Sequence, residues 1–261
     1  MKTMKTIKKT IDYILPILSV LLVFLLWGYA ATKNEILAGP VDTYRRLVEL
    51  LEHPKMGIPL YEHILSSFYR ILVAFIFASV IGIVLGVAFG IFPTFRRILW
   101  PVFSILRPIP PLAWIPLIVL WCGTRGDTSK IIIIFIGIVM AVIINTFAGI
   151  SHTDEMLLQA GKTLGASKWQ ILTDITLPNS IPVILAGLKT GLSTGWMSLV
   201  AAEMMVVDNG IGFLINDSLQ YYDTALDFVG IVLVALSSSL LTLILNLLER
   251  RLCPWMHLES K

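Results

Sequence analysis

Glu203 and Lys189 are the residues whose positions first suggest chemistry, because both lie in an apolar stretch, Ile181 to Val207. An ionisable side chain in a membrane span is costly and usually faces a bundle interior or water. By the 3.6-residue repeat, one helix face collects both side chains together with Ser193 and Trp196. The two lie about 21 Å apart along such a helix, too far to pair with each other. Either could line a solute pathway or pair with another helix, and Lys189 could also extend its ammonium to the membrane surface.

Other chemical motifs are incomplete. Gly161-Lys162-Thr163 matches the end of a phosphate-binding loop, but that loop requires glycine five residues earlier, where Met156 stands. The four histidines are scattered, without the paired spacing of metal ligands. No Ser-His-Asp or His-Glu-x-x-His arrangement is present in the apolar stretches. We therefore expect a protein that is not an enzyme and binds neither ATP nor a metal by these motifs.

The composition predicts an all-α polytopic membrane protein. Hydrophobic residues make up 56% of the 261-residue chain and charged residues only 14%, against about a quarter in a typical soluble domain. A helical span needs about 20 apolar residues. Six stretches qualify: Tyr13 to Ala31, Leu65 to Phe92, Ile98 to Trp121, Ile131 to Ile150, Ile181 to Val207 and Phe228 to Leu248.

Basic residues at the flanks of these stretches predict their orientation. Lysines precede the first stretch, Arg96-Arg97 follows the second, and Arg250-Arg251 follows the last, so both termini are expected in the cytoplasm. Gly28-Tyr29-Ala30 would also suit a signal peptidase, but the apolar run is long for a signal, and we expect this helix to be retained. The net charge of +3 comes from these flanks and does not indicate nucleic acid.

A proline-rich segment, Arg107 to Pro116, interrupts the third stretch. Its four prolines lack amide donors and bar a continuous helix. Broken backbone at membrane depth is tolerated where it is buried in protein or lines an aqueous cavity. Arg107, Pro110 and Trp114 are therefore candidates for a translocation pathway, and a kinked packing helix is an equal alternative. Like Lys189, Arg107 is expected toward the cytoplasmic end of its span.

Small residues recur in two other stretches. Ala78, Gly82, Gly86 and Gly90 lie at intervals of four, and Gly187, Gly191 and Gly195 repeat the pattern. Such stripes let helix backbones approach closely, so both are predicted to be packing faces.

The polar segment Asp154 to Pro178 separates two apolar stretches and is called the module below. It predicts two short amphipathic helices joined at Gly165, whose position favours a left-handed backbone. Thr153 is expected to cap the first helix, and Ser167 with Gln170 forms a capping box for the second, which Pro178 would end. The charges place the module outside the lipid, where it would meet a soluble partner.

The module resembles the cytoplasmic "EAA" loop of binding-protein-dependent (type I) bacterial ABC importer permeases. That loop has the pattern Glu-Ala-Ala, Gly, Ile and Leu-Pro. At the same intervals stand Gln159-Ala160-Gly161, Gly165, Ile175 and Leu177-Pro178. Gln159 departs from Glu, and Gly161 departs from Ala and is expected to loosen the helix locally. In that family the loop carries the coupling helix, which docks on an ATPase subunit.

Other segments narrow the resemblance. Arg107 to Lys130 resembles the nitrate, sulfonate and taurine subfamily, and Gly195 to Glu203 and the tail Arg250 to Trp255 resemble its taurine branch. The resemblance implies six transmembrane helices of the MetI-like fold. It also implies a homodimer in the bacterial cell membrane, working with two ATPase subunits that hold ATP and Mg²⁺ and with an external solute-binding protein.

Further implications concern the gate, the regions of the chain and the substrate. The resemblance assigns Gly210, Gly212 and Phe213 to an outer gate. It also divides the chain into an N-terminal helix with an outer connection (1–60), a core permease domain (61–252) and a cytoplasmic tail (253–261). The expected substrate is taurine or an alkanesulfonate, with nitrate, bicarbonate and a vitamin precursor as alternatives. An ion-coupled secondary transporter that uses Glu203 is the alternative from a different class.

Overall fold

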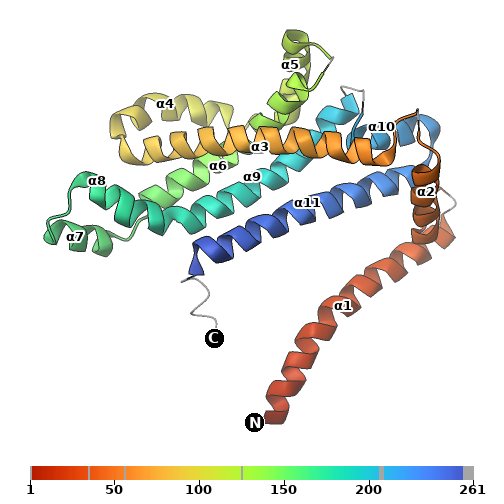
Figure 1. Ribbon diagram of the computed structural model, residues 1–261, viewed down its shortest axis with the longest axis horizontal. Helices are drawn as coiled ribbons and strands as arrows, with labels where there is room; N and C mark the ends of the chain where they lie inside the picture. The colour runs from red at the N-terminus through yellow and green to blue at the C-terminus, as the bar shows by residue number, and fades with distance from the viewer. Residues whose placement is uncertain (1, 35, 56, 125, 206–208, 255–261) are drawn as a thin grey trace. The chain divides into compact units, whose positions relative to one another are not determined.

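The structure is a computed structural model that describes residues 2–34, 36–55, 57–124, 126–205 and 209–254. Regular structure in these ranges is helical, apart from an isolated bridge between Lys55 and Ile58 (Figure 1). The elements in chain order are α1 (Lys2–Lys33), α2 (Pro40–Glu52), α3 (Leu60–Ile91), α4 (Pro93–Leu106), the 3-10 turn η1 (Pro111–Trp114), α5 (Ile115–Cys122), α6 (Thr128–Ser151), α7 (Glu155–Thr163), α8 (Lys168–Gln170), the π-helical turn η2 (Ile171–Thr176), α9 (Leu177–Met205), α10 (Ile211–Tyr221) and α11 (Thr224–Leu252).

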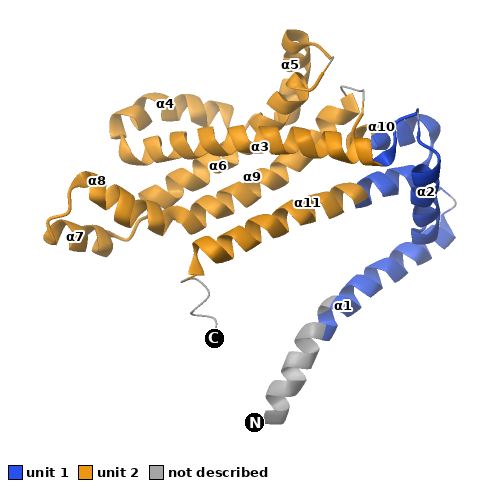
Figure 2. Ribbon diagram, in the orientation of Figure 1, with its two compact units in different colours: residues 1–60, 214–232 blue, residues 61–213, 233–261 orange. Residues whose placement is uncertain are grey.

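The chain divides into two compact units (Figure 2). The first contains residues 1–60 and 214–232. In it the Trp27 indole donates to the carbonyl of Ala38 at 3.0 Å and packs on Phe228 with ring centroids 4.8 Å apart. Arg46 of α2 pairs with Asp223 at 2.8 Å. The second unit, residues 61–213 and 233–261, contains the features described below.

Four helices are long and apolar enough to cross a membrane: α3, α6, α11 and the segment Lys168–Met205 that ends in α9. The pair α4 and η1–α5 makes a fifth if it counts as one broken span. The third predicted span is therefore not one straight helix, since its two halves meet at 87°. Pro108 and Pro110, which cannot donate to a preceding turn, lie at the break. The first predicted span lies within α1, whose part Ile17–Lys33 is apolar.

Helix α6 packs closely against both α3 and α9 because glycines of those two helices face it. A Cβ added to Gly82 of α3 would lie 2.8 Å from the Cβ of Val142, and one added to Gly191 of α9 would lie 3.0 Å from Ile138. The other stripe glycines repeat these approaches: Gly86 to Thr146, Gly90 to Ile150, Gly187 to Asn145 and Gly195 to Ile138. The prediction of two packing faces is confirmed, and both faces serve the same helix.

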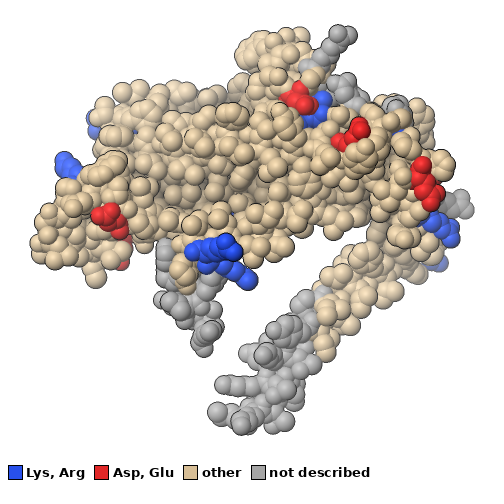
Figure 3. Space-filling model, in the orientation of Figure 1, with Lys and Arg blue, Asp and Glu red and all other residues tan. Residues whose placement is uncertain are grey.

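Few charged side chains are visible on one face of the second unit. On the face of the second unit seen in Figure 3, the surface over α3 is almost entirely uncharged, and acidic and basic side chains lie around α7 and α8. This distribution fits a helix bundle whose middle contacts lipid.

Candidate functional site

The module is a compact helix–turn–helix that projects from the ends of α6 and α9. Gly165 has φ +80°, and the amides of Ala166 and Gly165 donate to the carbonyls of Gly161 and Lys162, each at 3.0 Å. This is the Schellman arrangement, in which a left-handed glycine closes the helix C-terminus. The predicted turn at Gly165 is confirmed.

The helix starts in the module are fixed by side-chain caps. Ser167 and Gln170 form the predicted capping box, with bonds of 2.8 Å and 3.3 Å. The prediction that Thr153 caps α7 is wrong. Asp154 is the cap, accepting from the amide of Met156 at 2.8 Å, because the Thr153 hydroxyl donates back to Ile150 of α6 at 3.1 Å.

Pro178 does not end the second helix, contrary to the prediction. The backbone continues from α8 through η2 into α9, and Pro178 occupies the second position of α9. The amide of Leu177 donates to the carbonyl of Leu172, five residues earlier, and this wider turn makes room for a proline ring that would clash with a regular α-helical turn. Pro182 also lies inside α9.

Gly161 has a packing role that the sequence did not predict. It is buried, and an added Cβ would lie 2.6 Å from Cδ1 of Ile175 on η2. The glycine therefore sets the distance between the two halves of the module. Gln159 and Ala160 are exposed, and the Gln159 amide donates to Glu155 at 3.4 Å. Leu177 is half-buried at the start of α9.

Apolar side chains on the module point away from the helix bundle. Leu164 is 87% exposed, Met156 is 76% exposed and Trp169 is 70% exposed. They lie beside charged residues, so this surface suits an aqueous contact with a protein better than burial in lipid.

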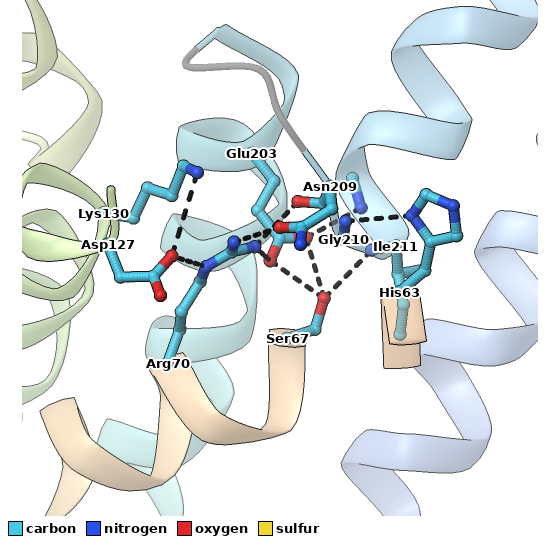
Figure 4. Close-up of polar contacts among 10 residues, drawn as sticks. His63, Ser67, Arg70, Asp127, Lys130, Glu203, Asn209, Gly210 and Ile211 are labelled. Carbon is cyan, nitrogen blue, oxygen red and sulfur yellow. Dashed lines mark hydrogen bonds and ion pairs between the residues drawn. The ribbon is translucent and has the colours of Figure 1, made fainter. Parts of the chain in front are cut away.

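At the opposite end of the bundle, a buried ion pair joins α3 to α9. Nη1 of Arg70 lies 2.6 Å from Oε1 of Glu203, and the two side chains are 2% and 0% exposed (Figure 4). Glu203 also accepts from the Ser67 hydroxyl at 2.8 Å and from the Gly212 amide at 2.9 Å. We call this cluster, with the residues described next, the polar network.

The same arginine fastens the turn that follows α9. Arg70 donates to both the main-chain and the side-chain oxygens of Asn209, and its Nε lies 2.6 Å from Asp127, which Lys130 approaches to 3.9 Å. The amide of Gly210 donates to Nδ1 of His63 at 3.1 Å, and that of Ile211 donates to the Ser67 hydroxyl at 2.9 Å. The turn Asn209–Gly212 is thereby held against α3.

The gate candidates lie on this network. Gly210 has φ +126° and sits over the Glu203 carboxylate, where an added Cβ would collide. Gly212 approaches the carbonyl of Val200 closely, since an added Cβ would lie 2.6 Å from it, and Phe213 stacks on His63 at 5.7 Å. The structure therefore brings Gly210, Gly212 and Phe213 together with Glu203.

The helix face proposed from the sequence does not form one site. Lys189 pairs with Glu249 of α11 at 2.5 Å, Ser193 donates to its own helix, and Trp196 is buried against Phe68 of α3. Lys189 and Glu203 thus each have a partner on another helix, which is one of the alternatives that the sequence left open.

Arg70 was missed at the sequence level, although a signal was present. It is the one charged residue in the predicted span Leu65 to Phe92. A lone charge in such a stretch calls for an opposite charge at the same depth.

A cavity of about 570 Å³ lies between the proline-rich segment, α6 and α9. Arg107 and Trp114 line it, whereas the neighbouring Pro111 takes the place expected for Pro110. The other lining residues are Leu106, Ile109, Leu112, Phe135, Ile136, Gly137, Val139, Met140, Ala141, Ile144, Thr194, Met197 and Ser198.

Arg107 follows the last residue of α4, at the break between the two halves of this span. Trp100 of α4 packs on Phe147 of α6 with ring centroids 4.8 Å apart. The helices run in opposite directions, so seven residues along each, about 10 Å, bring Arg107 level with Met140. Met140 is near the centre of α6, and both residues line the cavity.

These features define a multi-pass helical membrane protein with a broken span and a structured module between spans. Residues 78–257 match the family described as binding-protein-dependent transport system inner membrane component, and the chain belongs to this family. It is therefore the membrane-spanning permease subunit of an ABC transporter, as the resemblance implied.

Relatives in several organisms support the subfamily. The chain is 40% identical over 200 residues to the taurine transport system permease protein TauC of Escherichia coli, covering 77% of this chain and 72% of that protein. It is 32% identical to a putative aliphatic sulfonates transport permease protein, SsuC, of Bacillus subtilis, covering 87% and 81%. It is 31% identical to the nitrate import permease protein NrtB of Synechocystis, covering 83% and 82%.

A solved structure shows the same fold. The chain aligns with the inward-facing MetNI methionine ABC transporter at a TM-score of 0.62 and 19% identity, covering 74% of this chain and 95% of that one. The expected MetI-like fold is thus confirmed.

Proposed function

We propose that this chain is the permease of an ATP-driven importer for a small organosulfonate, taurine or a simple alkanesulfonate. The observation that carries the substrate is the 40% identity to a taurine permease, against 32% and 31% for the sulfonate and nitrate permeases. Nitrate, bicarbonate and a vitamin precursor are the competing substrates.

The proposed partners are a second copy of the chain, two ATPase subunits and an external solute-binding protein. The module would be the coupling helix, with Leu164 and Trp169 docking in a groove of the ATPase. Its caps and the Gly161–Ile175 contact make it rigid, and η2 continues into α9 without a flexible linker. Closure of the ATPase subunits would therefore move α9 as a unit, giving alternating access. ATP and Mg²⁺ would be held by the ATPase.

In this proposal the module would lie in the cytoplasm and the polar network on the outer side of the bacterial inner membrane. The N-terminus and the tail would then be cytoplasmic, and residues 255–261 of the tail lie outside the described part of the chain. The turn Asn209–Gly212 would belong to the outer gate.

The secondary-transporter alternative is disfavoured by the polar network. A carboxylate that binds a coupling ion must exchange it with water, but Glu203 is fully buried and accepts from Arg70, Ser67 and Gly212. The network gives it a partner in place of an ion.

Reconstitution tests the proposal. The chain is purified with a co-expressed ATPase and binding protein from its own operon, placed in vesicles, and assayed for uptake of labelled taurine, ethanesulfonate and nitrate. We expect ATP-dependent uptake of a sulfonate that ionophores do not abolish. Uptake that follows an ion gradient without the ATPase would overturn the importer, and uptake of nitrate alone would overturn the substrate.

A further inference from the structure

Arg107 stands out because it is a cation at the break of a membrane span and has no partner among the described side chains. Among the described residues it makes no side-chain hydrogen bond or ion pair. The ionisable residues Arg70, Lys189 and Glu203, by contrast, are all paired. A charge at this depth is expensive unless it faces water or a counter-ion. The 570 Å³ cavity that Arg107 lines provides such a place.

The described residues that line the cavity provide a positive charge and no negative charge. Arg107 is the only charged side chain among the described residues that line it. The two lining hydroxyls are already used as donors: Thr194 donates to the carbonyl of Gly137 at 2.7 Å, and Ser198 donates to that of Thr194 at 2.9 Å. The guanidinium thus offers an anion its planar fork of N–H donors, and no carboxylate among the described lining residues competes for that fork.

The remaining walls suit a short apolar group. Trp114, Phe135 and Met197 lie around the cavity with other apolar residues. Its volume falls within the range of about 300–1,000 Å³ typical of small-molecule sites. A sulfonate group on the guanidinium would leave a short alkyl chain against these walls.

We propose that Arg107 binds the anionic head group of the solute in transit, and that the cavity is a weak site for small anions with a short apolar body. This inference rests on the proposed importer function. It gives the permease a discriminating contact of its own, in addition to the selection exerted by the external binding protein.

The test uses the complete reconstituted complex and measures uptake and ATP hydrolysis in the same vesicles. Arg107→Gln should lower sulfonate uptake about tenfold to a hundredfold, which corresponds to losing a charge-assisted hydrogen-bonded contact. ATP hydrolysis stimulated by loaded binding protein should stay within about twofold of wild type, because the module is untouched. Arg107→Lys keeps the charge but not the fork and should recover part of the uptake. Arg97→Gln, in the first turns of α4 and outside the cavity, is the matched control and should behave as wild type.

A second variant tests the cavity walls. Met197→Phe should reduce uptake of butanesulfonate more than uptake of methanesulfonate, because it narrows the apolar part of the cavity. Wild-type sulfonate uptake with an unaffected Arg107→Gln variant would overturn the Arg107 contact and leave the importer standing. Equal loss of uptake and ATP hydrolysis in both Arg107 variants would show a structural role and also overturn it. If wild type carries nitrate only, the substrate proposal fails and the same variants are measured with nitrate.

Discussion

Removing Arg70 should destabilise the protein more than any substitution of an exposed charge. Arg70→Met leaves the Glu203 carboxylate buried without its cation, although Ser67 and Gly212 still donate to it. Breaking a buried pair by removing one partner costs about 3–5 kcal/mol. Arg70 also donates to Asn209, and the loss of that contact adds about 1 kcal/mol. We expect a loss of about 4–6 kcal/mol, or roughly 8–24 °C in the melting temperature at about 2–4 °C per kcal/mol.

A double-mutant cycle separates the free energy contributed by the Arg70–Glu203 ion pair from that of the other contacts of Arg70. Glu203→Gln alone leaves Arg70 with Asp127 as its remaining anionic partner, and Arg70→Met/Glu203→Gln removes both charges of the α3–α9 pair. The double variant should be less destabilised than the sum of the single variants by about 2–4 kcal/mol, because the uncompensated charge is gone. The assay is thermal unfolding in detergent, followed by circular dichroism, with the exposed Arg97→Met as the matched control. Additive effects, or a loss below about 1 kcal/mol for Arg70→Met, would refute the buried pair.

Three further predictions concern the module and α11. Gly165→Val places a β-branched side chain at φ +80° and should lower binding-protein-stimulated ATP hydrolysis severalfold while membrane insertion persists, whereas Gly165→Asn, which tolerates this φ, should retain most activity; equal activities would remove the account of the turn. Gly161→Leu should weaken co-purification of the ATPase, and adding Ile175→Ala should restore part of it by making room; no rescue would contradict the packing role. Lys189→Met should cost only about 0–1 kcal/mol in thermal unfolding, because this side chain and Glu249 are 25% and 21% exposed, and a loss near that of Arg70→Met would show a stronger pair.

The sequence predicted the features that depend on local chemistry or on spacing along one helix. The stripe at Gly82 and Gly86 was readable because close helix packing requires small residues at fixed intervals, and the left-handed turn at Gly165 was readable because few other residues adopt that backbone. The start of α9 could not be predicted, because a proline normally ends a helix. No local feature of the sequence shows that a π-helical turn will accommodate Pro178.

Pairings between distant segments could not be predicted from spacing. Arg70 and Glu203 lie 133 positions apart, and no spacing rule along one helix relates them. The direct packing of α3 against α9 brings them together, and local sequence does not reveal that packing.

Helix α9 contacts all three features and therefore determines how they are coupled. It begins at the module through η2, lines the cavity with Thr194, Met197 and Ser198, and ends in the polar network at Glu203. Its 29 residues form a rod about 43 Å long that resists bending far more than the loops around it. If the module moves with the ATPase, the same displacement shifts one wall of the cavity and pulls on the buried pair. The network would then hold the far end of α9 until enough energy arrives through the module, so weakening the pair should raise ATP hydrolysis in the absence of loaded binding protein. Ser67→Ala, which removes one hydrogen bond from Glu203 without leaving a bare charge, is the variant in which to measure it. An unchanged basal rate in Ser67→Ala would indicate that the network stabilises the fold without restraining the motion of α9.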